Sequence, residues 1–190
     1  MTIDSEGPTI GDVEPPTSFD LAEFEALYRR VTPRLLRYVM LKGMTRADAE
    51  EVVAETWLVT WKKVNTPVPP DRVAYIYGIA RKVFQRMRAS NRRRAWEPLP
   101  PGNRGPSVPD VSGAVDDYLV LKQRLEAIDL PDRQLDAYVL REYCGFTRKR
   151  VAQAMGITED TVATHLRRAR AKVAAFQEKI AALRKRKEQA

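Results

Sequence analysis

The sequence predicts an all-α protein of two small helical domains, a helical bundle and a helix-turn-helix domain, joined by a flexible linker. In both halves, apolar residues recur every three or four positions, which is the spacing of one helix face, and neither half shows convincing strand alternation. Between the halves, residues 97–113 hold five of the 13 prolines and three of the 9 glycines. Because proline removes backbone donors and glycine favours irregular turns, we expect a linker there. The 190 residues leave room for two such domains.

Three helices are expected before the linker. The first apolar stripe covers 21–38, and Pro33 is expected to kink or divide it, because proline lacks the N–H that a helix interior needs. The second stripe covers 49–61. The third covers 73–87, and Asp71 precedes it as a suitable N-cap.

After the linker, the most specific pattern is a short helix, a glycine turn and a longer helix within residues 147–172. Thr147 can cap the first helix, Gly156 can end it in the left-handed conformation, and Thr158 can cap the second. The expected inner face of the second helix is Val162, Leu166 and Ala169. The two helices and the glycine turn within 147–172 have the arrangement of a helix-turn-helix. Two helices are expected before this motif, over 115–128 and from 132 to about 143.

The second helix of this motif carries a polar and basic outer face. Such a helix fits the major groove, with its early residues at base edges and its basic residues on phosphates. An ordinary helical hairpin with a solvated basic face is the alternative. His165 has no partner ligand nearby in sequence, so we interpret it as a DNA contact or a surface residue rather than a metal ligand.

Two further surfaces are predicted in the N-terminal half. From Arg81 to Arg94 the chain has seven basic residues and no acidic ones, preceded by Tyr75 and Tyr77. Cations beside aromatic rings suit a nucleic-acid strand with exposed bases, although a solvated basic face with core tyrosines would look similar. The helix around 48–61 is instead acidic and aromatic, which suits a protein-docking surface. The alternative is an ordinary amphipathic helix with at least one tryptophan in the core.

Composition excludes several classes of protein. One Cys and one His rule out an internal disulfide, a cysteine-rich zinc site and the paired-histidine metal motifs, so we expect no metal and no cofactor. No apolar run reaches the roughly 18–20 residues that span a bilayer, and the first residues are acidic, so we expect a cytoplasmic protein without membrane insertion. The net charge is +8. Residues 1–17 carry −4, which leaves +12 on residues 18–190.

Taken together, these motifs resemble those of a bacterial RNA polymerase sigma factor of the extracytoplasmic-function class, group 4 of the sigma-70 family. Residues 48–58, Asp-Ala-Glu-Glu-Val-Val-Ala-Glu-Thr-Trp-Leu, resemble the segment that binds the polymerase clamp. Residues 75–82, Tyr-Ile-Tyr-Gly-Ile-Ala-Arg-Lys, resemble the helix that reads and melts the −10 promoter element. Leu130-Pro131-Asp132-Arg133 and the stretch 145–170 resemble the −35-reading domain. The resemblance covers roughly 19–95 and 115–175.

The resemblance implies a non-catalytic protein with three sets of contact residues. The implied polymerase-binding residues are Asp48, Glu51, Val52, Glu55 and Trp57. The implied −10 contacts are Asn65, Arg72, Tyr75, Tyr77, Arg81, Lys82, Arg86 and Arg88. The implied −35 contacts are Arg148, Lys149, Thr158, Asp160, Thr161, Thr164, His165, Arg167, Arg168 and Arg170. The implied partners are the polymerase core, through its β′ clamp and β flap, promoter DNA, and an anti-sigma factor.

The resemblance also implies the domain organisation. We expect an acidic disordered tail at 1–17, a region 2-like domain at 18–96, the linker, a region 4-like domain at 114–175 and a basic helical tail at 176–190. This chain departs from the family at three places: the family usually has Trp where Tyr75 stands, Asn where Lys82 stands, and acidic residues near Lys149. The promoter sequence that this chain reads is therefore expected to differ from the family's usual one.

Two other functions compete with this interpretation. A stand-alone helix-turn-helix regulator explains 147–172 but leaves the acidic 48–61 surface and the 81–94 run unused. A nuclease needs clustered carboxylates or histidines with a metal, and the lone His and dispersed acids argue against it.

Overall fold

The computed structural model describes residues 21–63, 69–94 and 115–188, and every element within them is helical. The predicted all-α class is therefore confirmed. The predicted acidic tail, the linker and Asn65 lie outside the described residues.

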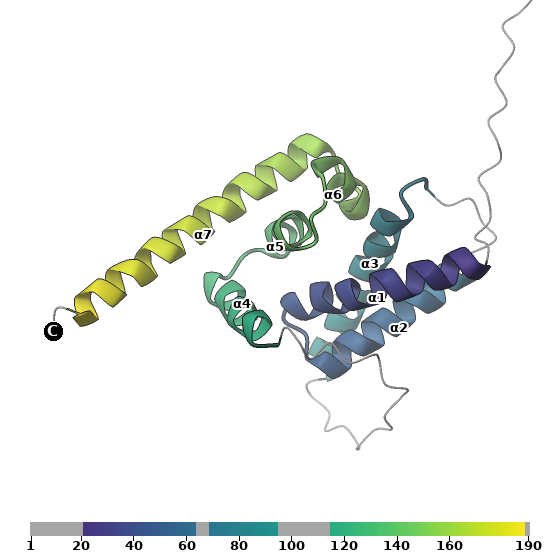
Figure 1. The fold of residues 1–190 in the computed structure, drawn as a ribbon, viewed down its shortest axis with the longest axis horizontal. Coiled ribbons are helices and arrows are strands. Elements are labelled where there is room, and N and C mark those ends of the chain that lie inside the picture. The colour runs from purple at the N-terminus through teal and green to yellow at the C-terminus, as the bar shows by residue number, and fades with distance from the viewer. Residues whose placement is uncertain (1–20, 64–68, 95–114, 189–190) are drawn as a thin grey trace, which may run out of the picture.

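Three helices make up the N-terminal half: α1 (Leu21–Leu41), α2 (Arg46–Lys62) and α3 (Arg72–Arg94). They form a bundle in which α1 and α2 lie side by side and α3 crosses behind them (Figure 1). Asp71 caps α3 as predicted, because its Oδ1 accepts a hydrogen bond from the Ala74 backbone N–H at 3.0 Å.

The prediction that Pro33 divides the first helix is wrong, since α1 runs through Pro33 as one helix. Val31 and Leu35, on either side of the proline, are both buried in the core. Burial of such side chains stabilises by about 1.5–3 kcal/mol each, which offsets a proline cost of about 3 kcal/mol. The Thr32 hydroxyl also donates to the Tyr28 carbonyl at 2.6 Å.

The C-terminal half contains α4 (Val115–Ile128), α5 (Asp132–Tyr138), the five-residue π-helical stretch η2 (Val139–Tyr143), α6 (Arg148–Met155) and α7 (Glu159–Glu188). The second helix of the motif is the longer one, as predicted, because α7 spans 30 residues and continues past position 176. Its C-terminal part projects away from the other helices (Figure 1), so the expected basic tail continues α7 as a helix.

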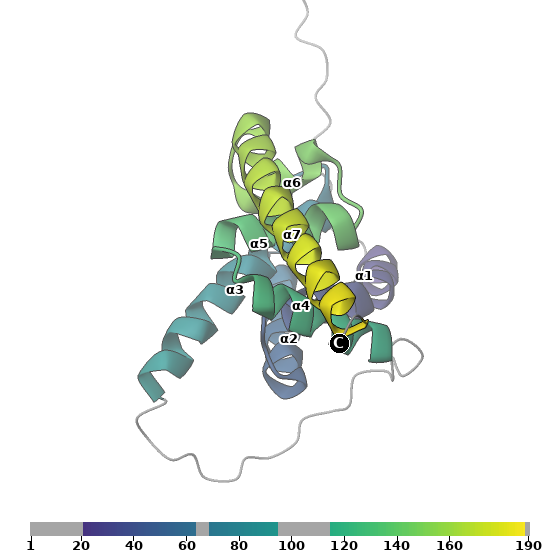
Figure 2. The same cartoon turned by 90° about the vertical axis from the view of Figure 1, so that its left-hand side faces the viewer.

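The two halves pack against each other and share one buried core. The flexible linker expected from the sequence is therefore not their only connection, because α6 lies across α3 and η2 lies against α1. The backbones approach closely at Gly78 of α3: a Cβ atom there would lie 3.2 Å from the Ala154 carbonyl oxygen of α6. Figure 2 shows that the C-terminal end of α3 extends beyond this contact.

Candidate nucleic-acid and protein interfaces

The helix-turn-helix is built by local hydrogen bonds that the sequence predicted. Thr147 Oγ1 accepts from the Arg150 N–H at 3.3 Å, and Thr158 Oγ1 accepts from the Thr161 N–H at 3.3 Å. Gly156 ends α6 with φ at +66°, a left-handed conformation that costs glycine little. Val162, Leu166 and Ala169 of α7 are buried, as predicted for its inner face.

Most of the predicted −35 residues lie on an accessible surface. The exposed members are Arg148, Lys149, Thr158, Asp160, Arg167, Arg168 and Arg170, and the half-buried members are Thr161, Thr164 and His165. Arg170 donates to Glu142 Oε1 at 2.6 Å, so a phosphate would have to replace this carboxylate. The pKa of His165 is lowered, first by burial and then by Arg133 and Arg168, so its imidazole is neutral near pH 7.

Most of the predicted −10 residues pack in the core or form ion pairs with other residues of the chain. Tyr77 is buried, with its ring centroid 4.8 Å from that of Phe146 in the C-terminal half, and Tyr75 is half-buried against the core. Lys82 is exposed. The arginines of the set pair with carboxylates: Arg72 with Glu23, Arg81 with Asp136, Arg86 with Glu55 and Arg88 with Asp132.

A buried charged cluster, the Asp136 cluster, joins the two halves. Its members are Asp136 of α5, Tyr38 and Lys42 near the end of α1, and Arg81 of α3. Lys42 Nζ lies 2.6 Å from Asp136 Oδ1, the Tyr38 hydroxyl donates to the same oxygen at 2.8 Å, and Arg81 Nε donates to Oδ2 at 2.9 Å. The side chains of Lys42 and Asp136 are each only 1% exposed.

Burial dominates the electrostatics of this cluster. It lowers the pKa of Lys42, although Asp136 opposes this effect, and it raises the pKa of Tyr38 with further contributions from Asp136. Sequence reasoning missed Asp136 and Lys42, because neither belongs to a local motif and the Tyr38–Asp136 contact joins residues 98 positions apart.

The predicted polymerase-binding set divides between the core and the surface. Val52 and Trp57 are buried, so they support α2 rather than face a partner, and Trp57 confirms that at least one tryptophan is core. Asp48 accepts the Thr45 hydroxyl at the helix start at 2.7 Å, Glu55 pairs with Arg86, and Glu51 is exposed.

Exposed residues of α2 form a continuous stripe, the α2 seam, that the predicted set largely missed. Its members are Ala47, Glu51, Ala54, Leu58 and Trp61. They are spaced alternately by four and three residues, which is the spacing of a coiled-coil seam. Leu58 is 53% exposed and Trp61 is 47% exposed. The signal in the sequence was this spacing, which places Leu58 and Trp61 on the face opposite to Val52.

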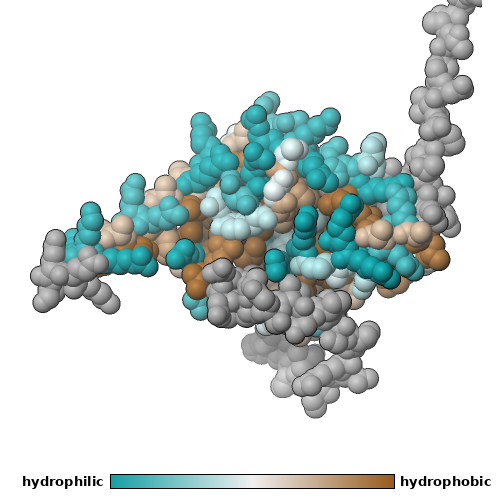
Figure 3. Space-filling model, viewed as in Figure 1, coloured by the Kyte–Doolittle hydropathy of each residue, from teal (hydrophilic) through white to brown (hydrophobic). Residues whose placement is uncertain are grey.

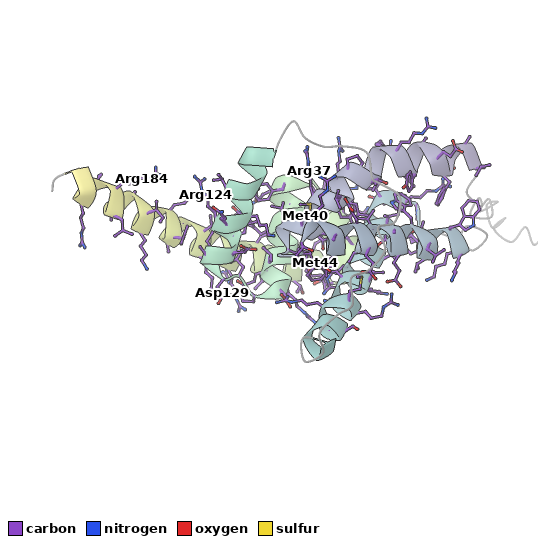
Figure 4. The ribbon with its side chains drawn as sticks, turned by 90° about the horizontal axis from the view of Figure 1, so that it is seen from below. Arg37, Met40, Met44, Arg124, Asp129 and Arg184 are labelled. Atoms are coloured by element: carbon purple, nitrogen blue, oxygen red, sulfur yellow. The ribbon has the colours of Figure 1, made fainter. Side chains whose placement is uncertain are left out.

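A second apolar surface lies between α4 and α7. The groove has a volume of 390 Å³ and is lined by apolar residues that include Leu121, Tyr143, Phe176 and Ile180. Apolar surface is visible alongside α7 in Figure 3. Arg124 on α4 and Arg184 on the projecting part of α7 line the same groove (Figure 4).

The part of the chain that the structure describes contains no group of His, Cys, Asp and Glu able to hold a metal ion. Among the same residues, no helix has the length and apolar character needed to cross a membrane.

Comparisons with known proteins match both halves. Residues 27–94 match the family described as Sigma-70 region 2, and residues 129–173 match Sigma-70, region 4. The region 2 match does not fit the alternative of a stand-alone helix-turn-helix regulator. The chain is 30% identical over 153 residues to the ECF RNA polymerase sigma factor SigL of Mycobacterium tuberculosis, covering 77% of this chain and 84% of SigL.

Two solved structures share the fold at 20% sequence identity. One is CnrH in complex with the cytosolic domain of CnrY, with a TM-score of 0.62 over 85% of this chain and 91% of that one. The other is the sigma factor RpoE in complex with the anti-sigma factor NepR from Bartonella quintana, with a TM-score of 0.63 over 83% and 98%. With both conserved regions present in order and a relative matched over most of its length, the chain belongs to the ECF sigma factors, non-catalytic subunits that direct RNA polymerase to promoters.

Proposed function

We propose that this sigma factor docks on the β′ clamp of RNA polymerase through the α2 seam. The exposed α2 seam is the observation that carries the proposal. Apolar residues at alternating spacings of four and three are suited to a partner helix, and a large exposed aromatic such as Trp61 is a frequent anchor of protein interfaces. Glu51 adds a charge that can select a basic partner.

The docking proposal is tested by core-polymerase binding of Trp61→Ala and Leu58→Ala. Leu183→Ala is the matched control, because Leu183 is an exposed leucine of similar accessibility on the distal part of α7. Loss of an interface anchor costs about 2 kcal/mol, or about 30-fold in affinity. Unchanged affinity in both α2 variants would mean that the polymerase binds elsewhere.

For the −35 element, we propose that α7 enters the major groove with its N-terminal turns. Asp160, Thr161 and Thr164 then face base edges, while the arginines around them contact phosphates. The ring nitrogens of His165 are buried, so this side chain has to turn outward to reach a base. The capped start and the buried inner face of α7 support this role, because they leave the opposite face for DNA.

For the −10 element, we propose that α3 captures a base that has been turned out of the non-template strand. Tyr75 and Lys82 are its accessible candidates for stacking and phosphate contact. Arg72 is a further candidate at the start of this helix, and Asn65, which lies outside the described residues, remains a candidate from the sequence. Turning out a base costs a few kcal/mol, so the contacts must offset that cost.

Two further partners are proposed on separate observations. We infer that the β flap contacts the C-terminal half, where the groove between α4 and α7 offers apolar surface with Arg124 and Arg184 at its edge. An anti-sigma factor is a further proposed partner, because both solved structures of similar fold are complexes with a second protein. A cytoplasmic location, with nucleoid association in the holoenzyme, follows from the family.

A further inference from the structure

The distal part of α7 carries an apolar stripe, the α7 seam, that continues the inner face of this helix beyond the helix-turn-helix. Its members are Val173, Phe176, Ile180 and Leu183. They follow the buried Val162, Leu166 and Ala169 with the same alternation of four- and three-residue spacings, which is that of a coiled-coil seam. The stripe therefore begins inside the protein and runs on along the projecting part of the helix (Figure 1).

The α7 seam forms one wall of the 390 Å³ groove between α4 and α7. The other residues that line this groove include Leu121 of α4 and Tyr143 of η2. Phe176 and Ile180 are half-buried, whereas Leu183, farther along the helix, is 48% exposed. A hollow with apolar walls between two helices is the kind of site that receives the apolar face of a third helix.

The charged positions of α7 that flank the seam are all basic. In the coiled-coil register they are Lys172, Lys179, Arg184 and Arg186. Glu178 lies on the opposite side of the helix, because it stands two positions from both Phe176 and Ile180. Arg124 of α4 lines the groove from its other side (Figure 4), and the described residues that line the groove include no carboxylate.

Charge and shape together select the occupant. If the seams of two copies of this chain met in parallel, Lys179 of one copy would flank Arg184 of the other, and like charges at these positions repel. A membrane surface requires a projecting apolar face, whereas Leu121 and Tyr143 line a hollow. An acidic helix of another protein satisfies both the charge and the shape.

We propose that the α7 seam is a docking site for an acidic amphipathic helix of a partner protein, whose carboxylates lie against Lys179 and Arg186. The region 4 match ends at residue 173, so most of the seam lies outside the segment shared with that family. The proposal goes beyond the flap contact inferred above. Leu183, Lys179 and Arg186 do not line the groove assigned to the flap, so substitutions there separate the two contacts.

A pair of designed peptides tests the charge and the shape together. The probe has about four heptads with Leu at both core positions and Glu at both flanking positions, and the matched control peptide has Lys at the flanking positions. Binding of each fluorescent peptide to the full chain is measured by anisotropy at low and at high salt. We expect about tenfold tighter binding of the Glu peptide, with an advantage that shrinks as salt rises. Equal affinities, or no binding of the Glu peptide, overturn the proposal.

Charge reversal on α7 should exchange the preference between the peptides. Lys179→Glu/Arg186→Glu is expected to bind the Glu peptide about tenfold more weakly and the Lys peptide more tightly than the wild type does. The control Arg29→Glu/Lys62→Glu changes the net charge equally at exposed positions of the N-terminal half and should keep the wild-type preference. A control that exchanges the preference equally well would show that only net charge acts, and this result overturns the proposal.

Leu183→Ala separates the acidic helix from other occupants of the seam. We expect about tenfold weaker binding of the Glu peptide and unchanged binding of core polymerase. Three results overturn the proposal: weaker core binding with wild-type peptide binding, a wild-type dimer in sedimentation that Leu183→Ala dissociates, and binding to phosphatidylglycerol vesicles that Leu183→Ala abolishes. They would place polymerase, a second copy or a membrane on the seam.

Discussion

The variant Asp136→Ala should be among the most destabilising single substitutions in the chain. It leaves the Lys42 ammonium, whose side chain is 1% exposed, without its carboxylate, and it removes the acceptor of Tyr38 and Arg81. Removing one partner of a buried ion pair costs about 3–5 kcal/mol. Because the total free energy of unfolding of such proteins is about 5–15 kcal/mol, roughly a fifth or more of the stability is expected to be lost.

Urea unfolding followed by circular dichroism and by tryptophan fluorescence measures this loss. All three tryptophans precede residue 97, so fluorescence reports on the N-terminal half while dichroism reports on all helices. Asp132→Ala is the control, because Asp132 is 57% exposed and its pair with Arg88 should contribute less than about 1 kcal/mol. The double variant Lys42→Met/Asp136→Leu should lose less stability than Asp136→Ala, because it leaves no buried ammonium unpaired, although Tyr38 and Arg81 still lose their acceptor.

The pH dependence of Asp136→Ala follows from the charge left behind. Burial already lowers the pKa of Lys42, and Asp136 is the main contribution that raises it, so its removal lowers the folded-state pKa further. The unfolded chain then binds more protons than the folded one below the ordinary lysine pKa, so the variant should gain stability as pH rises from 7 toward 10. A loss below about 1 kcal/mol at pH 7 would refute the view that Asp136 compensates buried charge.

The other predictions concern single surfaces. Trp61→Ala should weaken core-polymerase binding by about 30-fold, while Leu183→Ala leaves it unchanged. Arg168→Ala should weaken DNA binding and reduce the salt slope by about one phosphate contact; an unaltered slope would show that this side chain faces solvent. His165→Ala should change the preferred −35 sequence in a randomised-promoter selection, and an identical preference would exclude base readout. Burial raises the pKa of Cys144 to about 11, so its alkylation at pH 7.5 should be about 100-fold slower than that of a thiol of pKa 9.0 and should accelerate up to pH 11; a plateau near pH 9 would contradict this.

Local features of the fold could be predicted from the sequence because they depend on neighbouring residues. The caps at Asp71, Thr147 and Thr158 and the left-handed Gly156 each involve groups within three or four positions. Whether Pro33 divides its helix could not be decided from the sequence, because the outcome depends on how much apolar surface the rest of α1 buries against other helices.

The candidate surfaces were only partly predictable, because the phase of a helix depends on what packs against it. The stripe of α2 contains apolar residues on two faces, and only contact with α1 and α3 decides that Val52 and Trp57 are core while Leu58 and Trp61 are exposed. The packing of the two halves could not be predicted either. The residues that hold it, Asp136 above all, carry no local signal, and their partners are far away in the sequence.

The measurement that tests the central claim most directly is selection from a randomised promoter library, carried out with the free chain and with the chain bound to core polymerase. The account predicts that the holoenzyme enriches two separated elements, one read by α7 and one by α3. Enrichment of a single site by both samples would contradict two-element promoter recognition.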